Sequence, residues 1–487
     1  MSRARLIGMP AVATALACTG FALFASRLGV VPHRVAMAGF IALALVTLVL
    51  LVLSVDPAWL ISAAILSTVF AGHWGLLGLP SLVGPDRVLL AAGVIGPVFR
   101  IGPARERPPV RFTWIHYLLL CAVAYALMSA IVAGTVGRRY AILDLLDQFG
   151  FLPFFMFLLA PVIFATQRQR KILLGSIVGL AAYLSLTALF EKLHLNALVV
   201  PHYITDPSVG EHFGRARGPF VDAGADGLAL YACAVAAVVG AVTWRRPRWK
   251  LVSIAVAALA LLGVLLSQTR GAWLAAVVAS VVTLGTTPRL RALLLPVAIA
   301  AAVIVVGAFA VIPGLSQQTQ QRQSDQSPVY ERQNTTAAGL RMVAARPLLG
   351  FGWDYGGPQL APYFKLDPYI PLSGLGAGFH NQYLQYAVTL GLVGLGIWLL
   401  AVGGAFASAF SAPVAPDVAR WQVALKALLL SWVIIGLSAP AYYIFTTLLL
   451  WTWCGIVYGA GWTLQPVGGR ATTWRWSHGK PWRTAFG

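Results

Sequence analysis

The sequence is dominated by a long series of apolar segments, most of them close to 20 residues long. A hydrocarbon core about 30 Å thick is crossed by about 20 apolar residues in an α-helix. Such segments cover residues 6–26, 35–54, 57–79, 86–100, 112–134, 150–165, 171–190, 220–243, 250–267, 271–286, 292–312, 384–410, 422–439 and 441–462. The sequence therefore predicts an all-α fold, a polytopic membrane helix bundle with about 12–14 transmembrane helices.

The composition argues against an ordinary soluble enzyme. Of the 487 residues, 59% are hydrophobic and only 10% are charged, whereas about 25% of the residues in soluble domains are charged. The net charge is +20, from 35 Lys and Arg against 15 Asp and Glu. In a membrane chain we interpret this excess as basic loops facing anionic lipid, and we expect no nucleic-acid partner.

Short basic loops predict the orientation of the bundle. The most basic ones lie at 100–111, 168–171, 245–250 and 289–291, and the C-terminal tail is basic as well. Because Lys and Arg concentrate in cytoplasmic loops, we expect cytoplasmic N- and C-termini in a plasma membrane protein. A cleaved signal peptide is the alternative for residues 1–26, but the lack of a convincing cleavage site and the spans that follow favour a first crossing.

These features divide the chain into five predicted parts. They are N-terminal transmembrane helices (1–149), a central transmembrane region with arginine motifs (150–312), an outer helical loop domain (313–383), C-terminal transmembrane helices (384–462) and a basic cytoplasmic tail (463–487). The loop domain combines a Gln-rich stretch, an expected amphipathic helix and a segment rich in Gly, Pro and aromatic residues. A loop this long inside a compact body is usually functional or disordered.

Polar residues gather at the predicted outer ends of the spans. Arg215 and Arg217 precede one span, and Arg270 lies in a short turn between two others. An arginine at this depth is costly unless it reaches the interface or meets an anion, so each is either an anchor or an anion-binding group. Arg332 lies in the loop domain, and the pair His380–Asn381 lies where that domain meets the next span.

The remaining sequence signals are weaker. Trp353 and Tyr383 are suited either to stacking on sugar rings or to anchoring at the membrane interface. Phosphate-cradling loops, dinucleotide fingerprints, helical His pairs for a metal and nucleophile elbows are absent from the sequence. The residues alone therefore indicate an outward-facing site with several arginines, few acids and one well-placed histidine, and we expect neither a metal nor a cofactor there.

Four sequence elements, in this order, resemble the O-antigen ligase/polymerase superfamily of membrane glycosyltransferases. They are Arg-x-x-Gly-x-Phe at 215–220, Ser-x-x-Arg-Gly-Ala-Trp at 267–273, Pro-Leu-Leu-Gly-x-Gly at 347–352, and His-Asn at 380–381 followed by Leu-Gly-x-x-Gly at 390–394. One departure is Asp222–Ala223–Gly224, where many members have Asn-Pro-Asn.

The resemblance implies an inverting, metal-independent glycosyltransferase. Such proteins move a glycan from a polyprenyl-diphosphate carrier, such as undecaprenyl diphosphate, to an acceptor hydroxyl on the outer face of the bacterial inner membrane. Ligases deliver the glycan to a glycolipid, and polymerases deliver it to another lipid-linked glycan. The residues favour neither of these two acceptors.

Each predicted site residue has a role in this interpretation. Arg215 and Arg270 bind the diphosphate, because guanidinium groups suit phosphate oxygens. Arg217 is the second choice for the same role, and Arg332 holds the donor from the loop domain. His380 is the general base for the acceptor hydroxyl. Further substrate contacts are expected from Asn381, Trp353 and Tyr383.

Two other functions are compatible with parts of this pattern. A transporter or flippase of a lipid-linked glycan would also need cations for a diphosphate. However, transporters place their polar sites near the midplane on broken helices, whereas the charges here gather at one predicted face. A scaffold for polysaccharide synthesis would not explain Arg270 together with His380.

Overall fold

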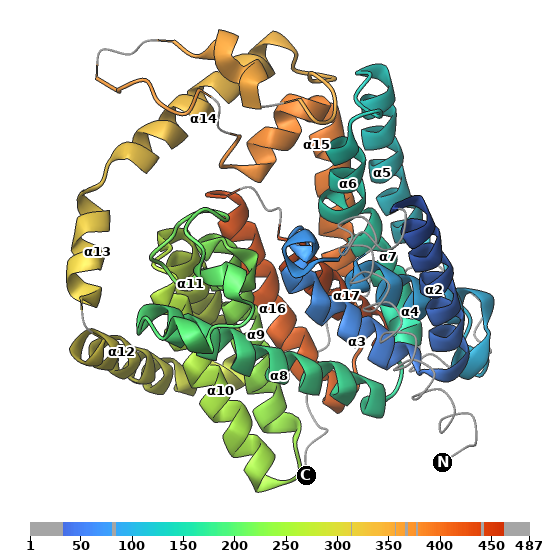
Figure 1. Ribbon diagram of the computed structural model, residues 1–487. Helices are drawn as coiled ribbons and strands as arrows, with labels where there is room; N and C mark the ends of the chain where they lie inside the picture. Colours follow the sequence, from blue (N-terminus) through green and yellow to red (C-terminus); the bar gives the residue numbers. More distant parts are fainter. Residues whose placement is uncertain are drawn as a thin grey trace, which may run out of the picture.

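The computed structural model describes residues 33–79, 84–312, 314–355, 357–365, 369–375, 378–439 and 443–461. Within these residues the chain is helical and has no strand. The body of the bundle consists of α2 (His33–Ser54), α3 (Pro57–Ser67), α4 (Pro85–Phe99), α5 (Trp114–Val132), α7 (Phe151–Ile163), α8 (Gln167–Lys192), α9 (Ala223–Thr243), α10 (Pro247–Leu266), α11 (Arg270–Thr286), α15 (Gln382–Ser411), α16 (Pro416–Gly436) and α17 (Ile444–Ala460) (Figure 1). The peripheral helices are α6 (Arg139–Asp144), α12 (Leu294–Val311), α13 (Leu315–Ser324) and α14 (Ser327–Ala345).

Eight helical segments in the described part of the chain are long and apolar enough to cross a membrane. They are 114–132, 141–163, 167–192, 223–243, 247–266, 288–311, 382–411 and 416–436. Four shorter apolar helices accompany them, at Leu45–Ser54, Pro57–Phe70, Arg270–Thr286 and Ile444–Ala460. The predicted fold class, an all-α polytopic membrane bundle, is therefore confirmed, and the count of about 12–14 crossings stays a prediction.

One predicted span differs clearly from the observed helices. The segment 57–79 is not one helix, because α3 ends at Ser67 and short 3-10 turns follow it. Gly72 between these turns has φ +85°, a left-handed conformation that cannot continue a right-handed helix. The predicted segment 86–100 agrees with the 15-residue helix α4. The predicted span 6–26 lies outside the described residues.

Small residues allow close helix contacts inside the bundle. A methyl group at Gly455 of α17 would lie 2.6 Å from the carbonyl oxygen of Phe157 in α7, and one at Gly459 would meet Pro161. In a bilayer, apolar side chains gain little by leaving lipid, so helix association depends on such close backbone approach. The pairing of 455 with 157 and of 459 with 161 shows that α7 and α17 run side by side in the same direction.

Ion pairs fasten the end of the bundle where α7 ends and α8 begins. Arg107 donates to the carbonyl oxygen of Ile163 and to the carboxylate of Asp56, at 2.6 Å and 2.7 Å. Arg170 of α8 pairs with Asp417 of α16 at 2.6 Å. We call this end, defined by these two ion pairs, the pinned end.

Predicted basic loops lie at the pinned end. The loop 168–171 opens α8, which starts there. Arg420, near the start of α16, donates to the carbonyl oxygen of Val242 near the end of α9, so the loop 245–250 after α9 lies there as well. The structure thus gathers these basic segments at one end, as the positive-inside pattern requires.

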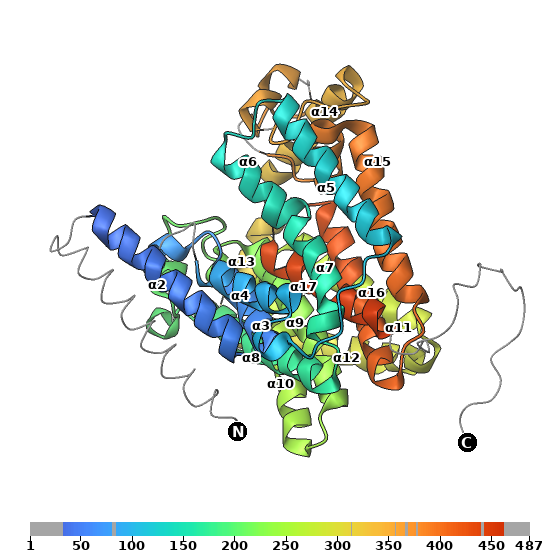
Figure 2. The ribbon, with the colours of Figure 1, turned by 90° about the vertical axis from the view of Figure 1, so that its right-hand side faces the viewer.

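The segment between α12 and α15 covers part of the opposite end. α13 leads away from α12, and α14 then runs over the bundle toward the start of α15 (Figures 1 and 2). A separate small apolar core joins α14 to the following loop and to α15, and it contains Ala338, Met342, Leu360, Phe379 and Val388. The described residues of the predicted loop domain are therefore largely helical, while its boundaries at 313 and 383 stay predictions.

Candidate functional site

A cavity of about 720 Å³ lies at the end of the bundle opposite the pinned end. Its walls come from the loop before α9, the turn between α10 and α11, the start of α14 and the segments that precede α15 and α17. The basic, acidic and histidine side chains in its lining are Arg215, Arg270, Arg332, Glu211, Asp222, Asp325, Glu331, His212 and His380.

Four of the predicted site residues line this cavity together. They are Arg215, Arg270, Arg332 and His380. The loop that carries the first of them is attached to the end of α10 by a hydrogen bond from the Ala216 N–H to the Leu266 carbonyl oxygen, at 3.2 Å. The grouping therefore arises from tertiary structure, since the residues come from four separate segments of the chain.

His380 is paired with a carboxylate that the sequence motifs do not indicate. Its Nε2 lies 2.9 Å from Oε1 of Glu331 in α14. Both side chains are one-third exposed, with relative side-chain areas of 33%, so the pair borders the cavity and is not sealed in the core. Glu331 directly precedes Arg332, and α14 therefore supplies both a carboxylate and a guanidinium group to the same wall of the cavity.

Asp325 adds a negative charge close to two of the arginines. Its carboxylate accepts hydrogen bonds from the Ser327 N–H at 3.0 Å and the Ser327 hydroxyl at 2.7 Å. These bonds lower the pKa of Asp325, and the positive charges of Arg270 and Arg215 lower it further. The lining thus carries four carboxylates beside three guanidinium groups.

Three non-glycine residues in or next to the cavity lining have left-handed backbone conformations: His212 and Gln268 line the cavity, and Val221 lies between two lining residues. The φ angles are 59° at His212, 46° at Val221 and 49° at Gln268. Such conformations cost about 1–3 kcal/mol each and cluster at functional sites, and Val221 is the most unusual because its side chain is β-branched. Both turns that carry the arginines are therefore held by the surrounding fold.

Gln268 is also unusual in its hydrogen bonding. It lies in the cavity wall two residues before Arg270 and is only 6% exposed. Neither Nε2 nor Oε1 of its amide has a hydrogen-bond partner among the described residues. A buried amide without hydrogen-bond partners costs free energy, so Gln268 lowers the free energy of unfolding relative to an apolar residue of the same size.

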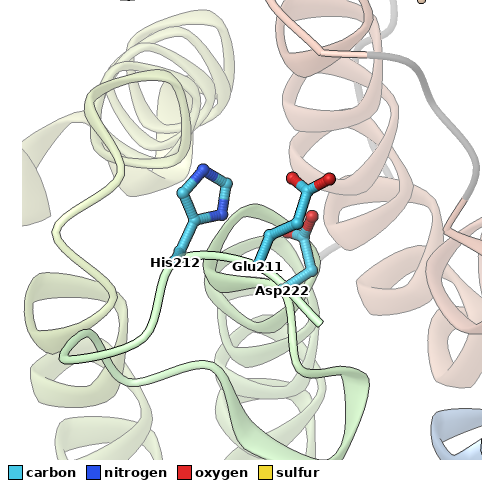
Figure 3. Close-up of side chains that lie close together, drawn as sticks. All are labelled: Glu211, His212 and Asp222. Carbon is cyan, nitrogen blue, oxygen red and sulfur yellow. The ribbon is translucent and has the colours of Figure 1, made fainter. Parts of the chain in front are cut away.

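Three side chains in the lining form a group that could hold a metal ion. Glu211, His212 and Asp222 each offer one ligand atom, and these atoms lie within 4.8 Å of one another (Figure 3). Asp222 already accepts hydrogen bonds from Gly224 N–H at 2.6 Å and Ala225 N–H at 2.8 Å, so it caps α9. Two carboxylates and an imidazole suit a divalent cation, yet carboxylates of this kind also balance the arginines nearby.

Arg217, predicted as a second phosphate-binding residue, lies outside the cavity. Only 1% of it is exposed, and it is absent from the lining. Its guanidinium group donates to the carbonyl oxygens of Ile204 at 2.8 Å, Asp206 at 2.5 Å and Val209 at 2.6 Å. In the structure Arg217 therefore holds the loop before α9 together, and its role as a second phosphate-binding residue stays a prediction.

Three other predicted contact residues, Trp353, Asn381 and Tyr383, are not part of the cavity lining. Trp353 is 5% exposed, and its Nε1–H donates to the Ala141 carbonyl oxygen at 2.8 Å. Asn381 caps α15 by accepting the Leu384 N–H, and the Tyr383 hydroxyl donates to the Val433 carbonyl oxygen at 3.1 Å. The structure thus shows a local structural role for each of these side chains, and their substrate contacts stay predictions.

Two of the family-like sequence elements have a structural explanation. The segment 347–352 inserts into a kink of α15 at Gly391, whose φ of 70° interrupts the helix. The N–H groups of Phe351 and Gly352 donate to the carbonyl oxygens of Val388 and Thr389, at 2.9 Å and 2.8 Å. These bonds replace helical ones that the kink leaves open, and they fix the segment between α14 and α15.

The cavity also contains residues to which the sequence patterns assigned no role in the site. They are Glu331, Asp325, Gln268, Glu211, His212 and Asp222. A usable signal existed for Gln268, which lies within the Ser-x-x-Arg element, and for Asp222, which begins the segment where many family members have Asn-Pro-Asn. Glu331 and His380 are 49 residues apart, so no local pattern connects them.

The comparisons with known proteins point to one family. The model of the O-antigen ligase family matches residues 255–399. This stretch contains Arg270, Arg332 and His380, whereas Arg215 precedes it. No curated protein gives a significant match to the chain. The family match confirms the resemblance to the O-antigen ligase/polymerase superfamily that the sequence elements predicted.

Proposed function

We propose that the protein is a membrane glycosyltransferase that transfers a glycan from a polyprenyl diphosphate, of the undecaprenyl type, to an acceptor hydroxyl. One observation carries the proposal: Arg215, Arg270 and His380, which lie in family-like sequence elements, line a single cavity together with Arg332 at one end of a membrane helix bundle. The match to the O-antigen ligase family supports this class of activity. A cavity at the ends of membrane helices is also where a lipid-borne diphosphate would arrive.

The arginines act on the leaving group. Arg215 and Arg270 bind the diphosphate, and Arg332 holds the donor from α14. The acceptor oxygen forms a bond to the anomeric carbon of the donor sugar, and the bond from that carbon to the diphosphate oxygen breaks. The diphosphate leaves with the electron pair, and the guanidinium groups stabilise its developing charge. Attack from the face opposite the leaving group inverts the anomeric configuration.

His380 acts on the nucleophile. It accepts the proton of the acceptor hydroxyl as the new bond forms, which makes the oxygen a better nucleophile. General bases of this kind contribute about 10²–10⁴-fold to a rate. The guanidinium groups supply the charge stabilisation that a metal would give elsewhere, so we propose a metal-independent reaction.

The proposed location follows from the two ends of the bundle. Basic loops lie at the pinned end, and such loops face the cytoplasm. The cavity at the opposite end then faces the outer side of the bacterial inner membrane. There it would meet the glycan donor and a glycolipid or glycan acceptor.

A glycan-transfer assay on purified variants tests the proposal. We expect His380→Ala and Arg270→Ala to lose most of the transfer activity, while Arg248→Ala at the exposed start of α10 retains it. Near wild-type rates for both cavity variants would refute the proposal. Donor flipping in liposomes that lack an acceptor would instead favour the transporter alternative.

The acceptor can be assigned in cells by deleting the gene and separating the surface polysaccharide by size. Loss of long chains, with single repeats still attached to the acceptor, indicates a polymerase. Loss of all attached glycan indicates a ligase.

A further inference from the structure

We propose that Glu331 is a positioning residue that fixes the orientation and the tautomer of His380. This inference rests on the proposed function, in which His380 takes the proton of the acceptor hydroxyl. Oε1 of Glu331 lies 2.9 Å from Nε2 of His380, and both side chains line the cavity. The short contact determines what each ring nitrogen can do.

The two nitrogens of His380 receive different roles. A carboxylate accepts hydrogen bonds and donates none, so the proton between the two side chains is carried by Nε2. In a neutral imidazole the lone pair is then on Nδ1. The acceptor proton therefore moves to Nδ1, and Glu331 keeps its charge without receiving a proton.

The side chain of Glu331 is packed closely against the loop that precedes α15. Gly374 lies so near that a methyl group there would lie 2.6 Å from Cγ of Glu331. A larger residue at 374 would therefore force the Glu331 side chain or the loop to shift, so this close packing contributes to the position of the pair.

The carboxylate also has an electrostatic effect during the reaction. When Nδ1 takes up the proton, the ring of His380 becomes a cation in a cavity whose lining holds three guanidinium groups and, besides Glu331, the carboxylates of Glu211, Asp222 and Asp325. The guanidinium groups oppose this change and the carboxylates favour it, and Glu331 is the carboxylate that contacts the ring. A carboxylate 2.9 Å from the ring offsets the repulsion and stabilises the imidazolium.

A purely structural role makes different predictions. In that case the contact would only fasten the segment before α15 to α14, and Glu331→Gln would preserve it, since the amide oxygen accepts the same hydrogen bond. A positioning role requires the charge and the tautomer. The amide of glutamine removes the charge, and its NH₂ group can turn to donate to Nε2, which favours the wrong tautomer.

The experiment compares kcat and KM for full-length Glu331→Gln, Glu331→Ala and Gly374→Ala, with Glu106→Gln at an exposed position far from the cavity as the matched control. The substrates are a polyprenyl-diphosphate-linked glycan and the matching acceptor. We expect kcat to fall about 10²-fold for both Glu331 variants and about 10-fold for Gly374→Ala. The donor KM and the thermal midpoint of Glu331→Gln should stay at their wild-type values.

A double variant separates this inference from the proposed function. If Glu331 acts through His380, Glu331→Gln/His380→Ala should be no slower than His380→Ala alone. Wild-type kcat for Glu331→Gln, in an assay where His380→Ala is inactive, would overturn the role of Glu331 and leave the proposed function intact. Additive losses in the double variant would also overturn it. Wild-type rates for His380→Ala would instead refute the general base itself.

Discussion

The two ends of the bundle use arginine in opposite ways. At the pinned end, Arg107 forms an ion pair with Asp56, and Arg170 forms one with Asp417. Both guanidinium groups also donate to carbonyl oxygens at the end of α7. At the cavity end, three arginines line a space of about 720 Å³ that is large enough for a ligand. The first arrangement ties helices together, whereas the second places three guanidinium groups beside four carboxylates in the lining of a cavity.

The same contrast recurs within three residues at the cavity end. Arg215 lines the cavity, whereas Arg217 is enclosed by the loop that precedes α9 and donates to its carbonyl oxygens. Both residues are arginines, and only Ala216 separates them in the sequence. The difference lies in the folded loop, which surrounds the guanidinium group of Arg217 with backbone carbonyl oxygens and places Arg215 in the cavity lining.

The largest expected effect comes from removing a cavity arginine. We expect Arg215→Ala to lower kcat for glycan transfer about 10²–10³-fold, because loss of one group that stabilises developing charge has this cost. Arg170→Ala at the pinned end should lower the thermal midpoint and leave kcat per folded molecule near the wild-type value. Transfer rates and unfolding curves measured on the same preparations check both statements. A slow Arg170→Ala enzyme with a normal thermal midpoint, together with a destabilised Arg215→Ala enzyme of normal kcat, would contradict the proposed difference between the two ends.

The second effect concerns stability at the cavity end. Arg217→Ala leaves several buried carbonyl oxygens without a donor, and we expect a loss of about 3 kcal/mol in the free energy of unfolding. Arg217→Lys should restore little of it, because an ammonium group cannot reach the same acceptors as the guanidinium fork. Thermal unfolding in detergent measures both variants. A stable but slow Arg217→Ala enzyme would show that this residue belongs with Arg215.

Much of the fold was predictable because it depends on segment hydrophobicity. The apolar segments predict most helices of the bundle. The prediction is wrong for the segment 57–79, where α3 is followed by 3-10 turns and by Gly72 in a left-handed conformation. The sequence elements also led to Arg215, Arg270 and His380, since each lies in a short pattern at the end of a helix. The structure brings all three to one cavity.

The rest of the site depends on contacts between distant segments. The sequence suits Trp353 either to stacking on a sugar ring or to anchoring at the membrane interface. In the structure its indole N–H donates to the carbonyl oxygen of Ala141, 212 residues earlier in the chain. Glu331 gave no signal, because its partner His380 lies on a different element. Hydrogen-bond partners of this kind follow from helix packing, and hydropathy and local spacing carry no information about them.

A smaller effect is expected at the cavity wall. Gln268→Met removes a buried amide that has no hydrogen-bond partner among the described residues, so the free energy of unfolding should stay constant or rise by about 1 kcal/mol. Gln422→Met is the matched control, because its amide donates to the carbonyl oxygens of Ala409 and Phe410 and its loss should destabilise. Thermal unfolding compares the two variants. If Gln268→Met were destabilised as much as the control, the amide would have a structural partner.

The smallest expected effect tests whether the cavity end relies on its arginines alone. Incubation with EDTA should leave the transfer rate unchanged, because guanidinium groups provide the proposed charge stabilisation. Asp222→Asn should behave likewise, since asparagine also caps a helix such as α9 while offering a weaker ligand to a cation. The group of Glu211, His212 and Asp222 makes this test decisive. Should EDTA abolish transfer and a divalent cation restore it in the wild type but not in Asp222→Asn, a metal ion would share the work of Arg215 and Arg270. The cavity end would then differ from the pinned end by a bound cation as well as by the arrangement of its arginines.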